Sequence, residues 1–238
     1  ISAAGPTIVR CIFRANRAIL DGGGLACVEY SNPTVLNCLL IGNRAGRGGG
    51  AAGSDEYSRP TFVNCAMAGN TGMNGGAMFN RGHSNAVLIN CTLAGNVASL
   101  FGGGIYNDAG SPVLDNCVLW GNRDSRPISQ RAQLDSEGGM PLVNYSCVQD
   151  DIPGDGQRFP GIGNIDADPR FARVPSDGGD GWGVGQNDDF GDLRLRSDSP
   201  CLDNANSDVL PYDVTDIDGD RNFTERLPRD LAHQGRFV

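Results

Sequence analysis

A repeat of 26 to 27 residues organises the first half of the chain. Five cysteines recur at spacings of 27, 27, 26 and 26 residues, and an asparagine follows each of them five positions later. A short run of apolar residues precedes each cysteine, and a glycine cluster follows the first four. A sixth, irregular unit ends at Cys147. The regular columns are Cys11, Cys38, Cys65, Cys91 and Cys117, and Asn16, Asn43, Asn70, Asn96 and Asn122.

The period and the composition together predict the fold. A unit of this length cannot bury an apolar face alone, so neighbouring units must stack. The runs of Val, Ile, Leu and Thr are too short for helices, and the 35 Gly and 13 Pro separate them as turn residues. Short strands that stack coil upon coil form a parallel β-helix, with coils ~4.8 Å apart. We therefore expect an all-β solenoid.

The two columns have structural roles in such a solenoid. The cysteines are expected to point inward as buried free thiols, because strand spacing of ~4.8 Å exceeds the ~3.5–4.5 Å between the Cβ atoms of a disulfide. Cys27 and Cys201 lie off the column, and the sequence leaves them either bridged or exposed. Each asparagine is expected to donate its side-chain amide to the asparagine one coil away.

Charge divides the chain into two parts. Residues 1–149 carry 10 Arg and 9 acidic residues, whereas residues 150–238 carry 9 Arg and 19 acidic residues. We expect regular β-helix coils in 1–149 and an irregular, loop-rich acidic continuation of the same solenoid in 150–238. The acidic part argues against nucleic acid as a partner, because it repels phosphates. No apolar run approaches the about 18 residues that span a membrane.

Short sequence motifs recur in the first half, and longer ones occur in the second half. They are FRAN 13–16, LIGN 40–43, MAGN 67–70, LAGN 93–96, LWGN 119–122, GNIDADPRF 163–171, LRLRSDSPCLDNA 193–205 and DVTDIDGDRN 213–222. The segments ending in Asn and the intervening Gly-rich segments are similar to the FxxN and GGA[ILV] repeats of polymorphic outer-membrane proteins. The second half is similar to the choice-of-anchor-Q-like tail of secreted β-helix proteins of the planctomycete type. The resemblance implies a right-handed parallel β-helix that is secreted or displayed at the cell surface.

An aspartate-rich stretch near the C-terminus suggests a metal site. Asp213, Asp216, Asp218 and Asp220 alternate around a glycine, as hard oxygen ligands do in calcium loops. The stretch is not an EF-hand, because the twelfth position is Leu227 rather than Glu. The alternative is a turn stabilised by aspartate side chains. We expect Ca²⁺ as the cofactor of this loop.

A charged column follows the glycine clusters along one flank of the predicted rod. Parallel β-helix enzymes that act on polysaccharides use an Arg or Lys base as lyases, or paired carboxylates as hydrolases. The coils here repeat no catalytic residue type, so we assign no catalytic residue and treat the column as a ligand-binding flank. Its members are Glu29, Asp55, Glu56, Arg81, His83 and Asp108, accompanied by Tyr30, Tyr57 and Phe79.

Two polar segments of the second half receive structural interpretations. Asp166 and Asp168 are expected to be solvated carboxylates in a turn. Residues 177–183 and the nearby Asp188, Asp189 and Asp192 predict a polar excursion from the rod, which is ordered only if an ion or a partner holds it.

We expect a non-catalytic extracellular or cell-surface rod that serves structure, adhesion, or the binding of a glycan or a surface protein. Stacked coils present a long rigid flank on which polar side chains recur at coil spacing. One alternative is a polysaccharide lyase or glycoside hydrolase that uses the charged flank as a groove. A second alternative is a subunit of a larger surface assembly. The sequence assigns no oligomeric state.

Overall fold

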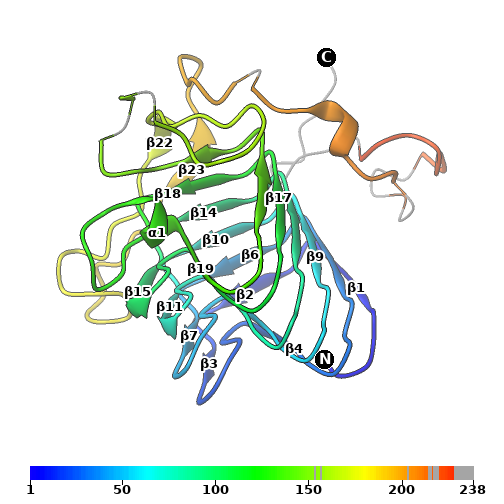
Figure 1. Ribbon diagram of the computed structural model, residues 1–238, viewed down its shortest axis with the longest axis horizontal. Helices are drawn as coiled ribbons and strands as arrows, with labels where there is room; N and C mark the ends of the chain where they lie inside the picture. Colours follow the sequence, from blue (N-terminus) through cyan, green and yellow to red (C-terminus); the bar gives the residue numbers. More distant parts are fainter. Residues whose placement is uncertain (153, 156, 203, 214–215, 217–219, 228–238) are drawn as a thin grey trace.

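The computed structural model describes residues 1–152, 154–155, 157–202, 204–213, 216 and 220–227. The chain forms an all-β parallel solenoid of about five turns, in which strands of successive coils lie side by side (Figure 1). The predicted fold class is confirmed. Within the described residues, no helix has the length and apolar character needed to cross a membrane.

Two six-stranded parallel sheets, which we call sheets A and B, form two faces of the solenoid. Each coil contributes one strand to each sheet, and a turn of two residues separates the two strands of the regular coils. Sheet A contains β1 (Thr7–Val9), β5 (Thr34–Leu36), β9 (Thr61–Val63), β13 (Val87–Ile89), β17 (Val113–Asp115) and β20 (Leu142–Asn144). Sheet B contains β2 (Ile12–Arg14), β6 (Leu39–Ile41), β10 (Ala66–Ala68), β14 (Thr92–Ala94), β18 (Val118–Trp120) and β21 (Cys147–Val148).

Two further parallel sheets, C and D, complete the coils. Sheet C contains β3 (Arg17–Ala18), β7 (Arg44–Ala45), β11 (Thr71–Asn74) and β15 (Val97–Phe101). Sheet D contains β4 (Leu25–Cys27), β8 (Ala52–Ser54), β12 (Met78–Asn80), β16 (Ile105–Asp108) and β19 (Leu134–Glu137), the last preceded by the short helix α1 (Gln130–Gln133).

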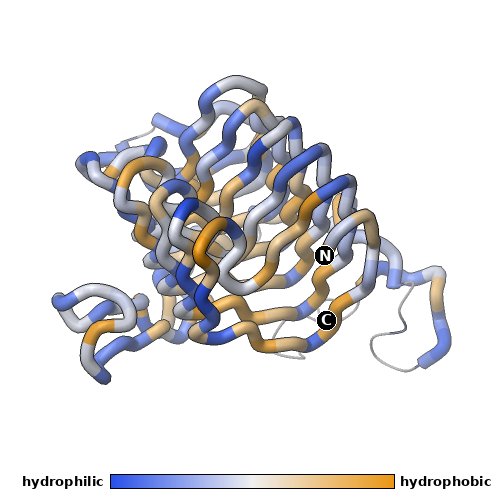
Figure 2. Tube along the Cα trace, turned by 90° about the horizontal axis from the view of Figure 1, so that it is seen from below, coloured by the Kyte–Doolittle hydropathy of each residue, from blue (hydrophilic) through white to orange (hydrophobic). Residues whose placement is uncertain are grey.

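The core runs along the axis of the solenoid. The constant period keeps equivalent residues in register, so Phe62 of β9 pairs with Leu88 of β13, which in turn pairs with Leu114 of β17. All three side chains are fully buried. Figure 2 shows the apolar segments recurring in line from coil to coil. Because each coil covers the apolar face of its neighbour, burial is continuous along the rod.

The cysteine column is buried as predicted, with one exception. From Cys38 to Cys147 each thiol lies in the core, but Cys11 is exposed because no described coil covers it. All eight cysteines, each within the described part of the chain, are free thiols. The thiol of Cys38, for example, donates to the carbonyl of Leu36 at 3.2 Å. Cys27 is buried too, and burial raises the pKa of its thiol to about 12.

The asparagine ladder is also confirmed. The side-chain amide of Asn43 donates to Oδ1 of Asn70 at 3.0 Å, and that of Asn70 donates to Oδ1 of Asn96 at 2.9 Å. The same oxygens accept the backbone N–H of the preceding asparagine. At the far end Asn122 donates to Gln133 of α1, which continues the ladder with a different amide. Buried polar groups are thereby satisfied from coil to coil.

The acidic second part folds back along the rod. Its antiparallel pair β22 (Phe171–Arg173) and β23 (Asp192–Leu195) is followed by the short 3₁₀ helix η1 (Ser207–Val209). Between the two strands, Trp182 is buried and its indole N–H donates to the carbonyl of Gly95 at 2.7 Å. The predicted excursion is therefore held by the rod itself, beside β11 and β15 (Figure 1). We call residues 177–190 the tail loop.

Cys201 of the tail meets the end of the cysteine column. Its thiol and that of Cys147 are hydrogen-bonded, which raises the pKa of Cys147 and lowers that of Cys201. The tail is fixed here by further contacts, because the hydroxyl of Ser199 donates to the carbonyl of Pro169 at 2.7 Å and accepts from the N–H of Cys201. The off-column cysteine is thus neither bridged nor fully exposed.

Candidate functional site

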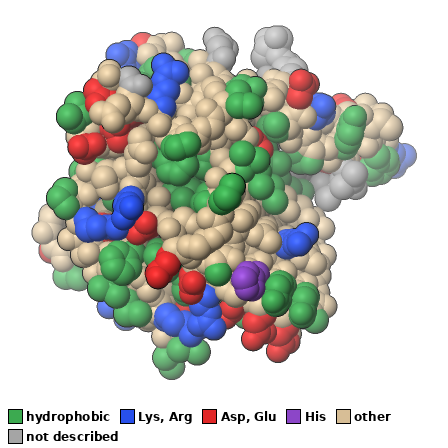
Figure 3. Space-filling view, viewed as in Figure 1, with side chains coloured by type: hydrophobic (Ala, Val, Ile, Leu, Met, Phe, Trp, Pro, Cys, Tyr) green, Lys and Arg blue, Asp and Glu red, His purple; other side chains and the backbone are tan. Residues whose placement is uncertain are grey.

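Three aromatic rings form a ladder on the surface of the rod. Tyr30 stacks on Tyr57 with ring centroids 5.5 Å apart and planes 7° apart, and Tyr57 stacks on His83 at 5.4 Å. Tyr30 and Tyr57 remain 65% and 52% exposed, and His83 is exposed as well. In Figure 3 the histidine lies beside apolar atoms near the lower edge of the molecule. We call these three residues the aromatic ladder.

The aromatic ladder is positioned by the turn that each coil makes after its sheet D strand. All three residues have a positive φ of 60° or 61°, a conformation uncommon for bulky side chains. The next residue in each turn is a buried serine, and the N–H of Ser31 donates to the hydroxyl of Ser58, whose own N–H donates to Ser84, both at 3.1 Å. This inner serine ladder fixes the turns in register, so the rings outside must stack.

Most of the predicted flank residues surround the aromatic ladder. Glu29 and Glu56 precede the two tyrosines and are exposed, and Glu29 accepts the hydroxyl of Ser2. Asp55 forms an ion pair of 2.9 Å with Arg81, so the two predicted charges neutralise each other. Asp108 lies one coil further on, where it pairs with Glu137 of β19 across the strands.

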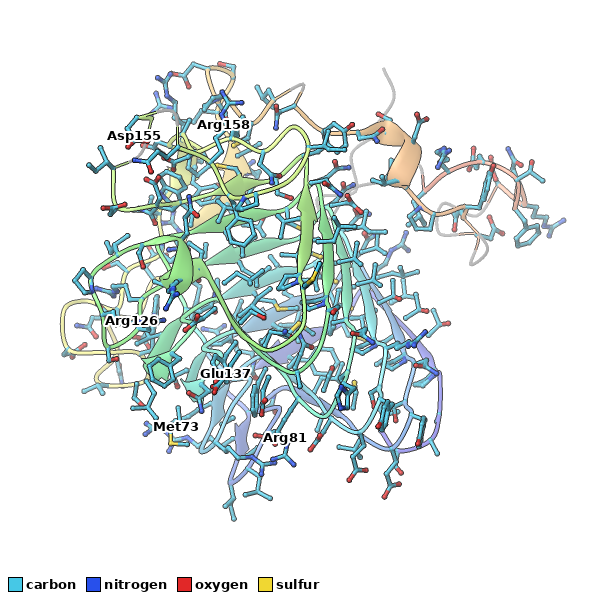
Figure 4. The ribbon with its side chains drawn as sticks, in the orientation of Figure 1. Met73, Arg81, Arg126, Glu137, Asp155 and Arg158 are labelled. Carbon is cyan, nitrogen blue, oxygen red and sulfur yellow. The ribbon has the colours of Figure 1, made fainter. Side chains whose placement is uncertain are left out.

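A second group of residues on this face was missed by sequence reasoning. The hydroxyl of Tyr106 donates to Oε2 of Glu137 at 2.7 Å, and burial together with this carboxylate raises the tyrosine pKa. Arg126 lies 5.1 Å above the ring of Phe101 and forms ion pairs with Asp124 and Asp135. Figure 4 shows Arg126, Glu137 and Arg81 on one face. The sequence did not reveal this group because residues 123–137 depart from the repeat.

Phe79 does not join the exposed rings, contrary to expectation. Its side chain is only 4% exposed and packs against Tyr106 with ring centroids 5.7 Å apart. The difference arises from its position inside β12 rather than in the following turn, which places it against the neighbouring strand β16.

The face is strongly acidic. Eight of the nine acidic residues of segment 1–149 lie on or next to sheet D, with three arginines paired to them. The resulting potential favours neutral or cationic ligands over polyanions. The acidic residues are Asp21, Glu29, Asp55, Glu56, Asp108, Asp124, Asp135 and Glu137, and the arginines are Arg47, Arg81 and Arg126.

The predicted calcium loop is only partly described. Asp218 lies outside the described residues. Asp213 is buried, whereas the carboxylate of Asp216 accepts the N–H of Arg221 at 2.9 Å and that of Asp220 accepts the N–H of Asn222 at 2.7 Å. The loop therefore stays a prediction.

Three other carboxylates do converge. Asp150, Asp155 and Asp166 offer oxygen atoms that all lie within 4.8 Å of one another. Asp150 and Asp166 are buried, which corrects the expectation that Asp166 is a solvated turn residue. The carboxylate oxygens of Asp166 accept the backbone N–H groups of Asp150 and Gly154, at 3.3 and 3.0 Å. Burial and the neighbouring Asp150 carboxylate raise the pKa of Asp166. This arrangement could hold a hard cation.

A cleft of about 690 Å³ separates the outer face of sheet B from the tail. Its floor is apolar and includes Leu39 and Ile41, and β22 and β23 contribute Arg173, Asp192 and Arg194 to its wall. Arg194 is ion-paired with Asp192, and Arg173 with Asp189, so this wall is internally neutralised.

Comparison with known proteins supports the fold. A family model described as the right handed beta helix region matches residues 1–119. No curated protein and no solved structure matches the chain.

Proposed function

The chain belongs to the right-handed β-helix family, and from that premise we propose that it is a non-catalytic rod, outside the cell or at its surface, that binds a neutral polysaccharide. The observation that carries the proposal is the aromatic ladder of Tyr30, Tyr57 and His83 with its surrounding carboxylates. A repeating ladder on a rigid scaffold suits a repeating polymer, because successive coils offer equivalent contacts.

The chemistry of the aromatic ladder favours polar recognition along its edge. The inner ring faces are occupied by neighbouring rings, so a ligand meets ring edges, tyrosine hydroxyls and the carboxylates of Glu29 and Glu56. Tyrosine combines apolar area with a hydrogen-bonding tip, and carboxylates accept strong hydrogen bonds from hydroxyl groups. The acidic face opposes an anionic polymer, which is why we propose a neutral one.

The ion pair between Asp55 and Arg81 supports binding rather than catalysis. A general base needs an available lone pair, and the guanidinium of Arg81 is instead engaged by the carboxylate of Asp55 at 2.9 Å. A hydrolase needs two carboxyl groups placed across one bond, each free to act. The carboxylate of Asp55 already forms an ion pair with Arg81 and accepts a hydrogen bond from the N–H of Glu56.

The test is a panel of neutral and acidic polysaccharides, scored for retention of the protein and for released oligosaccharides by mass spectrometry. We expect a neutral polymer to retain the protein without products. Tyr57→Ala should weaken retention about tenfold or more, as expected for a central tyrosine in a binding site. Tyr212→Ala, at another exposed tyrosine in the tail, is the matched control. Equal retention of both variants would remove the aromatic ladder from the binding site, and released products would establish an enzyme.

A further inference from the structure

A pocket of about 370 Å³ lies on another side of the rod, between the first three coils and the tail loop. Its floor carries Arg14 of β2, Arg17 of β3 and Arg44 of β7. Trp182 and Phe190 of the tail loop form its wall, with rings stacked 5.2 Å apart. The guanidinium of Arg14 lies 5.6 Å from the centre of the Phe190 ring.

Within the described residues, none of the three arginines forms an ion pair with an acidic side chain. Arg17 and Arg44 are directly opposite each other on neighbouring parallel strands, and Arg14 lies three residues before Arg17. Like charges placed opposite each other on adjacent strands destabilise a sheet. Among the residues that the structure describes, no carboxylate comes within 4.0 Å of these three guanidinium groups. Their mutual repulsion is therefore left uncompensated.

Another arginine at the opposite end of sheet C does have an acidic partner. Arg123 forms an isolated parallel bridge with Val97 of β15, and its guanidinium forms an ion pair of 3.1 Å with Asp177 of the tail loop. The tail loop thus provides a carboxylate for the arginine at one end of sheet C. At the other end, over Arg17 and Arg44, it provides only Asp188.

Asp188 does not cancel the charge. One of its oxygens accepts the N–H of Gly183 at 2.8 Å, which directs that oxygen to the tail loop's own backbone. The other oxygen is buried and, within the described part of the chain, has no hydrogen-bond partner. With three arginines and one aspartate, the lining carries a net charge of +2 in a protein whose net charge is −9.

We propose that this pocket binds a doubly charged tetrahedral oxyanion, either the free ion or a phosphate ester on a small molecule. Arginine is suited to this group, because its planar fork donates paired hydrogen bonds to phosphate-type oxygens. A dianion matches the charge of the lining. The volume lies at the small end of ligand pockets, which fits a group of monosaccharide size at most. This site is independent of the proposed polysaccharide contact on the acidic face.

The test is calorimetric titration of the whole chain with inorganic phosphate, at an ionic strength held constant with sodium chloride. We expect saturable binding that Arg44→Gln weakens at least about tenfold, since a hydrogen bond to a charged group is lost. Arg17→Gln should act similarly. Arg131→Gln, which removes an exposed arginine of α1 outside the pocket, should leave binding unchanged.

Two further measurements separate the outcomes. Without phosphate, Arg44→Gln should be at least as stable as the parent chain, because it relieves repulsion, so weak binding by this variant cannot come from misfolding. Inorganic sulfate and glucose 6-phosphate identify the source of the anion: tighter binding of the ester assigns a phosphorylated small molecule, and equal binding assigns the free ion. Binding that survives Arg44→Gln, or that sodium chloride reproduces, overturns the proposal.

Discussion

The regular coils and the acidic tail differ in how their polar groups find hydrogen-bond partners. In the coils, each buried polar group finds its partner in the next coil, as Asn70 does in Asn96. In the tail, contacts with the rod occur once each, such as the hydrogen bond from Trp182 to Gly95 and the one from Asn206 to Asn116. Repetition lets neighbouring coils support each other cooperatively. A single contact supports only its own segment, so the two parts should respond differently to damage.

The largest effect is expected from breaking the inner ladder of the coils. Asn96→Ala removes the acceptor of both the N–H and the side-chain amide of Asn70, and it removes one of the two donors to Oδ1 of Asn122. Each buried group left unpaired costs about 1–3 kcal/mol, so the free energy of unfolding should fall by about 3–5 kcal/mol in urea titrations. Asn204→Ala, at a half-buried tail asparagine with a side-chain hydrogen bond to the carbonyl of Gly163, is the control and should change stability by about 1 kcal/mol or less. Similar losses in the two variants would erase the distinction between coils and tail.

A smaller effect is expected from releasing the tail. Trp182→Ala removes a buried ring that stacks on Phe190 and donates to Gly95. The loss should stay below the about 3–5 kcal/mol typical of a buried aromatic residue, because the tail can detach without opening the coils. Hydrogen exchange should show faster exchange in residues 177–190 and unchanged protection in β9, β10 and β12. Loss of protection in those strands would show that the tail is part of the coils' cooperative unit.

The next effect concerns the carboxylate cluster. The pKa of Asp166 is raised in the folded chain, so the folded state holds this proton more tightly than the unfolded state does. Its ionised form therefore opposes folding above the folded pKa, and this cost is relieved as the pH falls through that value. Relative to Asp166→Asn, the parent chain should gain stability between neutral and acidic pH. A flat difference between the two urea-derived free energies across that range would contradict the raised pKa.

Calcium binding provides a second test of the same carboxylate cluster. If Asp150, Asp155 and Asp166 hold Ca²⁺, the ion should raise the melting temperature of the parent chain and remove the pH dependence just described. Asp155→Asn should abolish the rise, whereas Asp220→Asn tests the loop predicted from sequence. A rise lost only in Asp220→Asn would place the ion in that loop instead.

The smallest effect on the coils is expected from oxidation. Oxidised glutathione should convert the contacting thiols of Cys147 and Cys201 to a disulfide, with the two hydrogen atoms transferred to glutathione as its two thiols. Peptide mass spectrometry should find this pair, and Cys201→Ser should abolish it. Protection of the coils should not change. A bridge between column cysteines such as Cys91 and Cys117 would contradict the spacing argument.

How much could be predicted from sequence follows the same division. The fold, the buried cysteines and the asparagine ladder were readable because a fixed period places equivalent residues in line. The flank around Tyr57 and His83 was readable for the same reason, although the stacking of the rings was not. Contacts outside the regular repeat could not be predicted. The hydrogen bond between Tyr106 and Glu137 depends on the irregular segment before β19. The proximity of Asp150 and Asp166 depends on a turn whose length is not repeated elsewhere in the chain.

The tail also limits how such a rod can change in length over evolution. A whole coil of 26 or 27 residues could be duplicated or deleted without breaking the inner ladder, because within the regular coils each asparagine side chain bonds to the equivalent asparagine of the next coil. The tail has no such freedom: Phe190 lies under Arg14 of the first coil, while Asp177 pairs with Arg123 of the fifth. The tail therefore contacts the first and the fifth coil at fixed positions. Gain or loss of a coil between these two contacts would require a matching change in the length of the tail, so the tail constrains the number of regular coils.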